Sequence, residues 1–473
     1  FIIMLEFHKK NPKNPDKTEP EKRIKDFQEI YSQFDSKTSV EQSSRCSQCG
    51  VPFCQIHCPL NNNIPDWLKY IAEGRLEEAY QISSSTNVFP EVCGRVCPQD
   101  RLCEGNCVVE QAGFGAITIG NLEKYLTEVA FEKGWVKNLQ KNNSSNQKIA
   151  IIGSGPAGMA ASSYLVQNGY QVDVFEKHDR VGGLMIYGIP NFKLDKSIVE
   201  RRTQWLIDSG VKFHVNKEIG KDISFQDLEK DYDAILVATG VYKARKLDIE
   251  TSNIENSLPA LDFLIESNKV GLGDSPSSNK NLNAKDKHVV VIGGGDTAMD
   301  CVRTAIRQNA KEVTCLYRRN KENMPGSARE VLNAEQEGVK FNWLSVPSKL
   351  ITKDKLASTL SYKIATLGEA DETGRRKPID TGLEKQIKSD LIIQALGFEP
   401  EDLNSQFNTN LDLTSWNTIK VDYKKFQTSN PKIFAAGDIV RGASLVVWAI
   451  HDGREVAKSI HQYLQNSQIK KAS

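Results

Sequence analysis

The chain has 473 residues, 39% hydrophobic and 26% charged, which suffices for about three domains with substantial cores. Its 61 Lys and Arg residues balance 60 Asp and Glu residues, so a net charge of +1 would not gather nucleic acid or an anionic membrane. No apolar run approaches the roughly 20 residues that span a bilayer. The opening five residues lack the length and flanking charge of a signal peptide, so a cytoplasmic location is expected. Because residue 1 is Phe, the chain could also be a section of a longer polypeptide.

The first 145 residues are predicted to form a mainly helical domain rich in cysteine. A helix is possible over Arg23–Ile30, and apolar residues recur with helical spacing over 64–80 and again from Ile119 to about Gly134. The polar run 138–147 is expected to be a linker.

Eight of the ten cysteines lie in two groups of four within this domain. A proline follows Cys58 in the first group and Cys97 in the second. Four thiolates at short spacing can surround one metal centre. The two groups are Cys46, Cys49, Cys54, Cys58 and Cys93, Cys97, Cys103, Cys107.

Three kinds of chemistry could explain these cysteines. Disulfides are disfavoured, because no secretion signal is present and a chain of this length needs no covalent staples. Structural zinc usually has two well-separated Cys-x2-Cys pairs, whereas uneven spacing and Cys-Pro steps are typical of ferredoxins. We therefore predict two [4Fe-4S] clusters, with zinc as the alternative and His57 as a less favoured ligand. Cys301 and Cys315 are expected to be buried packing residues.

The segment 148–158 predicts a dinucleotide site. An apolar run leads into Gly153, Gly155 and Gly158, with Pro156 and Ala157 opening a helix. A second apolar run ends at Glu176. This pattern is typical of a strand–turn–helix–strand unit in which a pyrophosphate lies at the helix N-terminus and the acid binds a ribose.

Three later segments are expected to complete an FAD site. A glycine-rich loop contains Gly183 and Leu184, and an apolar strand near 432–438 ends in Gly437 and Asp438, whose acid could bind the ribityl chain. The helix expected from Val446 could stabilise negative charge on a reduced flavin through its N-terminal amides.

A second fingerprint covers 288–298. Gly293, Gly295 and Ala298 have the G-x-G-x-x-A spacing, with Asp296 and Thr297 at the expected start of the helix. Its second strand ends in Arg318 and Arg319, where the first fingerprint has an acid. Arginines suit a 2′-phosphate, so the site is predicted to bind NADPH rather than NADH, unless the pair is merely exposed.

The predicted fold is therefore α/β, with two doubly wound dinucleotide-binding domains, one inserted in the other, after the helical iron–sulfur domain. The FAD-binding domain is assigned to 146–284 plus 421–473, and the NADPH-binding domain to 285–420, with a crossover at 271–280. Nicotinamides donate electron pairs and clusters accept single electrons, and a flavin converts between the two. The three cofactors are thus expected in series, without a catalytic side chain, because positioning supplies the rate.

Three specific motifs, over 90–105, 293–303 and 322–327, carry a family resemblance that extends from about Arg45 to Gly453. The chain resembles the small (β) subunits of bacterial NADPH-dependent glutamate synthase. The resemblance implies electron transfer to an FMN-containing large subunit, which makes glutamate from 2-oxoglutarate and glutamine, in a hetero-oligomer. It further implies one cluster on Cys46, Cys49, Cys54 and Cys107, and another on Cys58, Cys93, Cys97 and Cys103.

Other functions remain open at this stage. Nothing here resembles a glutaminase or an FMN-binding barrel, so the chain alone should not make glutamate. Dihydropyrimidine dehydrogenase, in its N-terminal part, and subunits that exchange electrons between NADPH and ferredoxin share the arrangement. A non-catalytic scaffold that contains zinc is an alternative of another class.

Overall fold

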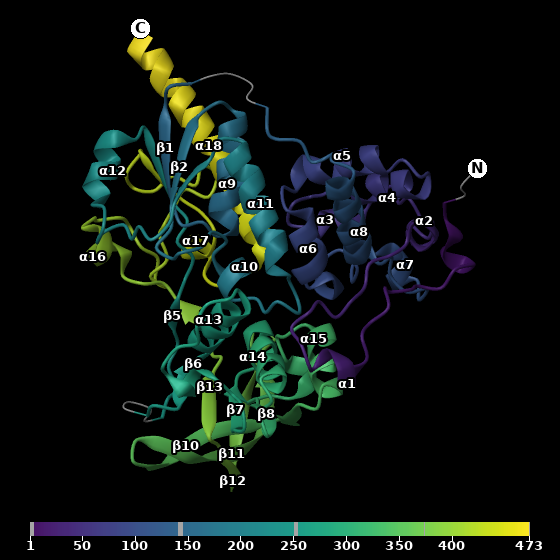
Figure 1. Cartoon of the computed structure of the whole chain (residues 1–473), viewed down its shortest axis with the longest axis vertical. Coiled ribbons are helices and arrows are strands. Elements are labelled where there is room, and N and C mark those ends of the chain that lie inside the picture. The colour runs from purple at the N-terminus through teal and green to yellow at the C-terminus, as the bar shows by residue number, and fades with distance from the viewer. Residues whose placement is uncertain (1–3, 141–144, 250–253, 373, 473) are drawn as a thin grey trace.

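The computed structural model describes residues 4–140, 145–249, 254–372 and 374–472, with side chains up to residue 467. Figure 1 shows three bodies: a cluster of helices from the N-terminal third, an upper α/β body that contains β1 and α18, and a lower α/β body that contains β7 and α14. This arrangement confirms the predicted fold class. None of the helices in the described parts is long and apolar enough to cross a membrane.

The N-terminal body is helical, as predicted. Gly74, at φ +75°, breaks the helix expected over 64–80 into two helices. The helix considered possible over Arg23–Ile30 does not form there, because α1 covers Pro20–Arg23 and ends where that helix would begin; the Arg23 side chain forms a buried ion pair with Glu337. The predicted linker lies partly outside the described residues, which omit 141–144. The helices are α1 (Pro20–Arg23), α2 (Ser36–Ser43), α3 (Phe53–Ile56), α4 (Ile64–Ala72), α5 (Leu76–Thr86), α6 (Pro90–Val96), α7 (Val108–Gln111) and α8 (Ile119–Glu132), with 3-10 turns η1 (Glu6–His8) and η2 (Gln99–Arg101).

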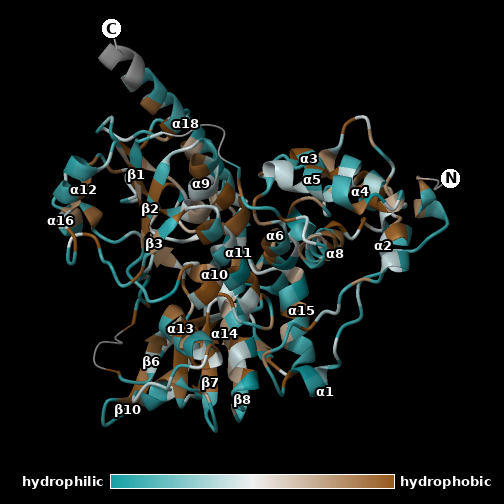
Figure 2. Ribbon diagram, turned by 45° about the horizontal axis from the view of Figure 1, so that its top comes forward, coloured by the Kyte–Doolittle hydropathy of each residue, from teal (hydrophilic) through white to brown (hydrophobic). Residues whose placement is uncertain are grey.

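The upper body is built on a parallel sheet of order β15-β4-β1-β2-β3. Side chains alternate between its faces, so that Ile149 and Ile151 enter one core and Ala150 and Ile152 another. Both faces are covered, which explains why β1 and β4 are almost entirely apolar. Figure 2 shows the resulting apolar ribbon around β1, β2 and α9. The elements are β1 (Lys148–Ile152), α9 (Pro156–Gln167), β2 (Gln171–Phe175), α10 (Leu184–Tyr187), α11 (Lys196–Asp208), β3 (Lys212–His214), α12 (Phe225–Asp231), β4 (Ala234–Val237), α16 (Leu403–Phe407), β15 (Ile433–Ala435), α17 (Asp438–Arg441) and α18 (Val446–Ala472).

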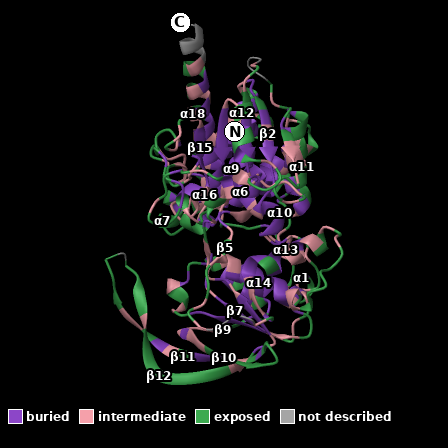
Figure 3. Ribbon diagram, turned by 90° about the vertical axis from the view of Figure 1, so that its left-hand side faces the viewer, coloured by how far each residue is buried: buried purple, intermediate pink, exposed green. Residues whose placement is uncertain are grey.

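The lower body repeats this design in a parallel sheet of order β6-β13-β7-β8-β9. Val289 and Val291 pack under its helices, whereas Val290 and Ile292 pack against an antiparallel sheet, β10-β11-β12. The far end of that antiparallel sheet is exposed (Figure 3). The elements are β6 (Ser257–Pro259), α13 (Ala260–Gly271), η3 (Lys280–Leu282), β7 (His288–Ile292), α14 (Asp296–Arg307), β8 (Glu312–Leu316), η4 (Lys321–Asn323), α15 (Ala328–Gln336), β9 (Lys340–Asn342), β10 (Ser345–Lys353), β11 (Leu356–Ala370), β12 (Arg376–Lys388) and β13 (Leu391–Gln394).

The chain crosses between the two α/β bodies at a two-stranded ribbon. The outgoing β5 (Lys243–Ala244) pairs antiparallel with the returning β14 (Phe398–Glu399). The crossover therefore lies before β6, rather than at the polar stretch 271–280. On the return, Leu403 and Phe407 already belong to the core of the upper body. The lower body thus runs from about β6 to β13, which shifts both predicted boundaries, at 285 and 420, toward the N-terminus.

A buried ion network, which we call the junction network, joins the N-terminal arm to the lower body. Its members are Arg23, Arg303, Arg307, Glu330 and Glu337. The carboxylate of Glu337 accepts hydrogen bonds from Arg23 at 2.7 Å, Arg303 at 2.8 and 3.0 Å, and Arg307 at 2.6 Å. Burial alone would raise the pKa of Glu337, but the hydrogen bonds from Arg307 and Arg303 outweigh it and lower the pKa to about 2.

The upper body reaches the same place through the loop before α11. The ring of Phe192 lies 4.5 Å from the guanidinium of Arg303 and 4.0 Å from that of Arg307. The neighbouring Lys193 forms a 2.7 Å ion pair with Asp300 on α14. All three bodies therefore meet at the junction network and the two side chains beside it.

We expect Glu337→Gln to lower the free energy of unfolding by about 3–5 kcal/mol, because it leaves three buried arginines short of a countercharge. The measurement is urea denaturation of the full chain. The carboxylate has a lowered pKa in the folded state, so its contribution is present above about pH 4.5 and is lost as the pH falls toward 2. The difference between the wild type and the variant should therefore shrink over that range.

Glu335→Gln is the matched control, since Glu335 lies on the same helix and pairs with Lys321 at the surface. It should change the stability by less than about 1 kcal/mol. If both substitutions lower the free energy of unfolding equally, burial does not determine how much the network stabilises the protein.

Candidate functional site

The turn after β1 has the geometry of a pyrophosphate cradle. Gly153 has φ +105°, and a Cβ there would lie 2.4 Å from the carbonyl oxygen of Ala238 at the end of β4. A Cβ on Gly158 would lie 2.1 Å from the oxygen of Gly153. Around Gly155, in contrast, nothing lies within 4 Å of such an atom. The first and third glycines are therefore required by packing, while the second leaves the N-terminus of α9 open to a ligand.

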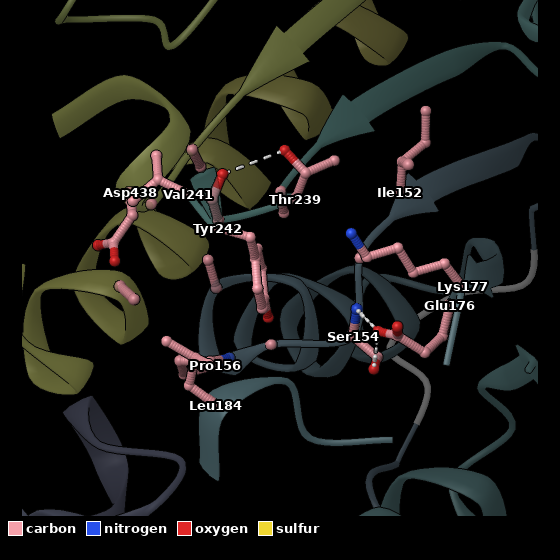
Figure 4. Close-up of a pocket in the computed structure, with 18 of the residues that line it drawn as sticks. Ile152, Ser154, Pro156, Glu176, Lys177, Leu184, Thr239, Val241, Tyr242 and Asp438 are labelled. Carbon is pink, nitrogen blue, oxygen red and sulfur yellow. Dashed lines mark hydrogen bonds between the residues drawn. The ribbon is translucent and has the colours of Figure 1, made fainter. Parts of the chain in front are cut away.

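This turn forms one wall of a pocket at the carboxyl ends of β1, β4 and β15, drawn in Figure 4. Open parallel sheets bind ligands at this edge. Two predicted residues support the pocket from outside its lining: Gly158 lies under the turn, and Gly183, at φ +54°, packs against Gly155. The predicted residues that line it are Gly153, Gly155, Pro156, Ala157, Glu176, Leu184, Gly437 and Asp438.

Two carboxylates lie on opposite sides of the pocket (Figure 4). Glu176 accepts hydrogen bonds from Ser154 Oγ at 2.6 Å, from the Ser154 amide at 3.1 Å and from the His178 amide at 2.9 Å. Asp438 accepts one from Ser444 Oγ at 2.7 Å, and burial raises the pKa of Asp438. Both groups keep free acceptor positions, so an elongated ligand with hydroxyl groups at two places would fit between them.

Several lining residues were not predicted from the sequence. Tyr242 follows β4, and its ring lies 4.8 Å from the ammonium of Lys177, while burial raises the pKa of the Tyr242 hydroxyl. Glu401 and Gln406 belong to the segment that returns after β14. No local motif marks Glu401 and Gln406, because only the return of the chain at β14 brings them to the pocket.

The turn after β7 repeats the first turn closely. Gly293 has φ +146°, a Cβ on it would lie 2.2 Å from the oxygen of Ala395, and the position of Gly295 is again open. Ala298 replaces the third glycine and is fully buried. The predicted residues Asp296 and Thr297 lie in the first turn of α14.

The two arginines follow β8 at the same edge of the sheet. Leu316 pairs with Ile292 in register, as Phe175 pairs with Ile152 in the upper body. Tyr317 therefore takes the position of Glu176, and Arg318 and Arg319 come one and two residues later. The Nε atom of Arg319 is buried without a hydrogen-bond partner.

Four of the eight predicted metal ligands line one pocket in the helical body: Cys58, Cys93, Cys97 and Cys103. Glu123 and Val447 also line it. Val447 is the second residue of α18, whose first residue, Val446, lines the pocket of the upper body. The first turn of α18 therefore lies between the two pockets.

The other four cysteines form a second neighbourhood. Cys46 and Cys107 are buried in the core of the helical body, and Cys54 packs against the same core. Burial raises the pKa of Cys46 to about 11 and that of Cys54 to about 12, and binding of iron would remove these protons. Cys58 and Cys103 pack against this same core, so the two sets adjoin.

Cys301, Cys315 and His57 lie outside the two cysteine sets. Cys301 and Cys315 are buried in the core of the lower body, as expected for packing residues. His57 is exposed and bonds through Nδ1 to the oxygen of Phe53 at 2.9 Å. Within the described residues every cysteine is a free thiol, and no three His, Cys, Asp or Glu side chains converge as ligands of a single metal ion. In a [4Fe-4S] cluster, in contrast, each thiolate binds a different iron atom. The four sulfur atoms therefore surround the cluster and do not converge on one ion.

Comparison with known proteins identifies the family. Residues 23–135 match the family described as dihydropyrimidine dehydrogenase domain II, 4Fe-4S cluster, and residues 147–453 match the pyridine nucleotide-disulphide oxidoreductase family. The glutamate synthase [NADPH] small chain of Azospirillum brasilense is 54% identical over 97% of this chain and 96% of that protein. The chain belongs to this small-chain family.

Two further comparisons show the breadth of the likeness. The putative oxidoreductase AegA of Escherichia coli is 41% identical over 96% of this chain and 70% of its own length. The solved structure of FprA from Mycobacterium tuberculosis in complex with NADPH has a TM-score of 0.59 and 19% identity over 69% of this chain and 86% of that one, which supports the fold alone. By its family, the chain is a pyridine-nucleotide-dependent flavin oxidoreductase with a 4Fe-4S domain.

We expect Gly155→Val to abolish FAD binding, because the side chain would fill the open space at the N-terminus of α9. The iron content should stay at the wild-type level, since the cysteines belong to another body. The measurement is the ratio of flavin to iron to protein. Gly271→Val is the control, because Gly271 ends α13 on the surface with nothing within 4 Å of its Cβ position. Retention of full FAD by Gly155→Val would contradict the cradle.

Proposed function

We propose that the chain is the electron-input subunit of a glutamate synthase. It oxidises NADPH and delivers single electrons to the FMN of a large subunit, which makes glutamate from 2-oxoglutarate and glutamine. The observation that carries this proposal is the shared first turn of α18, where Val446 faces the flavin pocket and Val447 the pocket of four cysteines.

The residues of the upper body fit FAD. The open cradle at Gly155 has room for the pyrophosphate. Glu176 accepts hydrogen bonds from the ribose hydroxyls, and Asp438 accepts them from the ribityl hydroxyls. When bound, FAD supplies the exchange between hydride and single electrons. The chain's own contribution is to bind, to orient and to exclude water, and the N-terminus of α18 adds a positive potential beside the pocket.

The lower body fits NADPH. Gly295 leaves room for the pyrophosphate at the N-terminus of α14, as Gly155 does at α9. Arg318 and Arg319 supply positive charge at the position expected for a 2′-phosphate. The unpartnered Nε of Arg319 supports this role, because a buried donor without a partner is costly unless a ligand satisfies it.

The cysteines fit two [4Fe-4S] clusters in series. We place the first on Cys58, Cys93, Cys97 and Cys103, beside the flavin pocket, and the second on Cys46, Cys49, Cys54 and Cys107. The core of the helical body, against which Cys54, Cys58 and Cys103 all pack, links the two sets. The description of the matching family favours iron–sulfur clusters over the zinc scaffold. Because such cysteines must stay reduced, we place the chain in the cytoplasm.

An exposed apolar patch marks where the electrons would leave. Val51, Phe53 and Ile56 are 59%, 46% and 57% exposed and lie between or beside Cys49 and Cys54 of the second set. Apolar side chains in such a position are typical of a surface that a partner covers. We therefore assign this patch to the large subunit, in a hetero-oligomer.

A different electron acceptor is the second candidate. The likeness to the putative oxidoreductase AegA extends over nearly the whole of this chain, so the same relay could serve a partner such as a ferredoxin.

We expect Arg318→Ala combined with Arg319→Ala to raise the KM for NADPH by roughly 100-fold while changing the KM for NADH by less than about threefold. The measurement is NADPH- and NADH-dependent reduction of an artificial acceptor. The double substitution of Arg375 and Arg376, two exposed adjacent arginines of the same body, is the matched control. Equal effects on both nucleotides would exclude the phosphate role.

Delivery of electrons is tested with Cys97→Ala and a glutamate synthase large subunit. The wild type should support glutamate formation from 2-oxoglutarate and glutamine. The variant should keep FAD, yet lose iron and glutamate formation. Cys301→Ala, which alters a thiol outside both sets, should behave as wild type. Reduction of ferredoxin but not of the large subunit would favour the second candidate instead.

A further inference from the structure

A loop of the lower body, residues 323–327, lies directly on the turn that we assign to NADPH. The amide of Gly326 donates to the oxygen of Gly294 at 2.8 Å, and the amide of Ser327 donates to Asp296 Oδ1 at 2.9 Å. A Cβ on Gly326 would lie only 3.1 Å from that same oxygen of Gly294. The position of the turn therefore depends on where this loop is held.

The loop is held by a residue of a different body. Arg101 belongs to η2 of the helical body, between Cys97 and Cys103. Its Nη1 donates to the oxygen of Pro325 at 2.5 Å, and its Nη2 donates to the oxygen of Gly326 at 2.6 Å. Hydrogen bonds from a guanidinium are charge-assisted, and two parallel ones also fix the orientation of the acceptor.

A second contact runs across the same interface in the opposite direction. Arg329, near the start of α15, donates through Nη2 to the oxygen of Arg95 at 3.4 Å. The two arginines thus bracket the loop, one from each body. The approach of the loop to the turn is consequently not a property of the lower body alone.

The loop also carries an unsatisfied polar group. The hydroxyl of Ser327 is buried and has no hydrogen-bond partner, although Ser327 is the residue before α15. A buried hydroxyl without a partner costs about 1–3 kcal/mol, so it is expected where a bound ligand supplies the missing partner. Its position one residue after Gly326 places that ligand at the junction of the loop and the turn.

We propose that Arg101 is a positioning residue for NADPH, through which the iron–sulfur domain completes the nucleotide site of another domain. Arg101 does not touch the nucleotide. It fixes Pro325 and Gly326, these residues fix Gly294 and Asp296, and the turn so placed binds the pyrophosphate. This inference rests on the proposed function in one respect, the binding of NADPH at the second turn.

A purely structural role would have a different signature. If Arg101 only fastened two bodies together, its removal would lower stability or iron content and leave nucleotide affinity unchanged in the protein that remains intact. If Arg101 positions the loop, its removal raises the KM for NADPH and the Kd for NADP⁺ with little change in kcat at saturating nucleotide.

The experiment uses the full chain with FAD and iron in place. The Kd for NADP⁺ is obtained from the change in flavin absorbance, and the KM and kcat for NADPH are measured with ferricyanide as acceptor. We expect Arg101→Met to raise both Kd and KM by roughly ten-fold, as for the loss of charge-assisted hydrogen bonds, and to change kcat by less than about twofold. Arg101→Lys, which can keep one of the two bonds, should recover part of the affinity.

Arg75→Met is the matched control, since Arg75 lies on the surface of the same body and its contacts are with nearby Glu73, Glu78 and Tyr70. It should match the wild type in all three constants. If Arg101→Met loses iron, the same constants are measured on Arg101→Gln, which keeps a neutral donor.

A wild-type Kd for NADP⁺ in Arg101→Met, or in Arg101→Gln if only that variant retains iron, overturns the positioning role, because neither side chain can make the two charge-assisted bonds. Failure of the wild-type protein itself to bind NADP⁺ would instead refute the proposed function, so the two failures can be told apart.

Discussion

Three arginine side chains from two parts of the chain converge on one buried carboxylate, that of Glu337, and the arrangement of the molecule depends on this contact. Buried charges are tolerated only when they are fully paired, so the N-terminal arm must lie against α14 and α15 for the network to form. The same place receives Phe192 and Lys193 from the upper body. The network therefore sets how the lower body faces the flavin pocket and the cysteines.

The two α/β bodies contain the same tight glycine turn after their first central strand. In each, the first glycine of the turn is pressed against a carbonyl at the end of the neighbouring strand, and the second is open. The differences lie at the edges: Glu176 in one body, Tyr317 followed by two arginines in the other. A shared backbone geometry thus supplies two cradles, and a few side chains give them opposite charge and, by our proposal, different nucleotides.

Function in this proposal follows from the order of neighbouring sites. The flavin pocket and the first cysteine pocket meet at the start of α18, the two cysteine sets adjoin in the core of the helical body, and exposed apolar residues lie beside the outer set. Arg101 adds a connection in the other direction, from the cysteine segment back to the nucleotide turn. The helical body is in this view both the path by which electrons leave and a part of the site by which they enter.

The local sequence was sufficient to predict the two fingerprints, the strands that flank them, the helix from Ile119 and the two groups of cysteines. These features depend on residues close in the sequence, through turn sterics and the periodicity of apolar side chains. Only the tertiary structure decided the crossover at β5 and β14, the entry of Tyr242 and Glu401 into the pocket, and the contact of Arg101 with a loop more than 200 residues away. The buried ion pair of Arg23 with Glu337, more than 300 residues away, likewise has no signal in the local sequence.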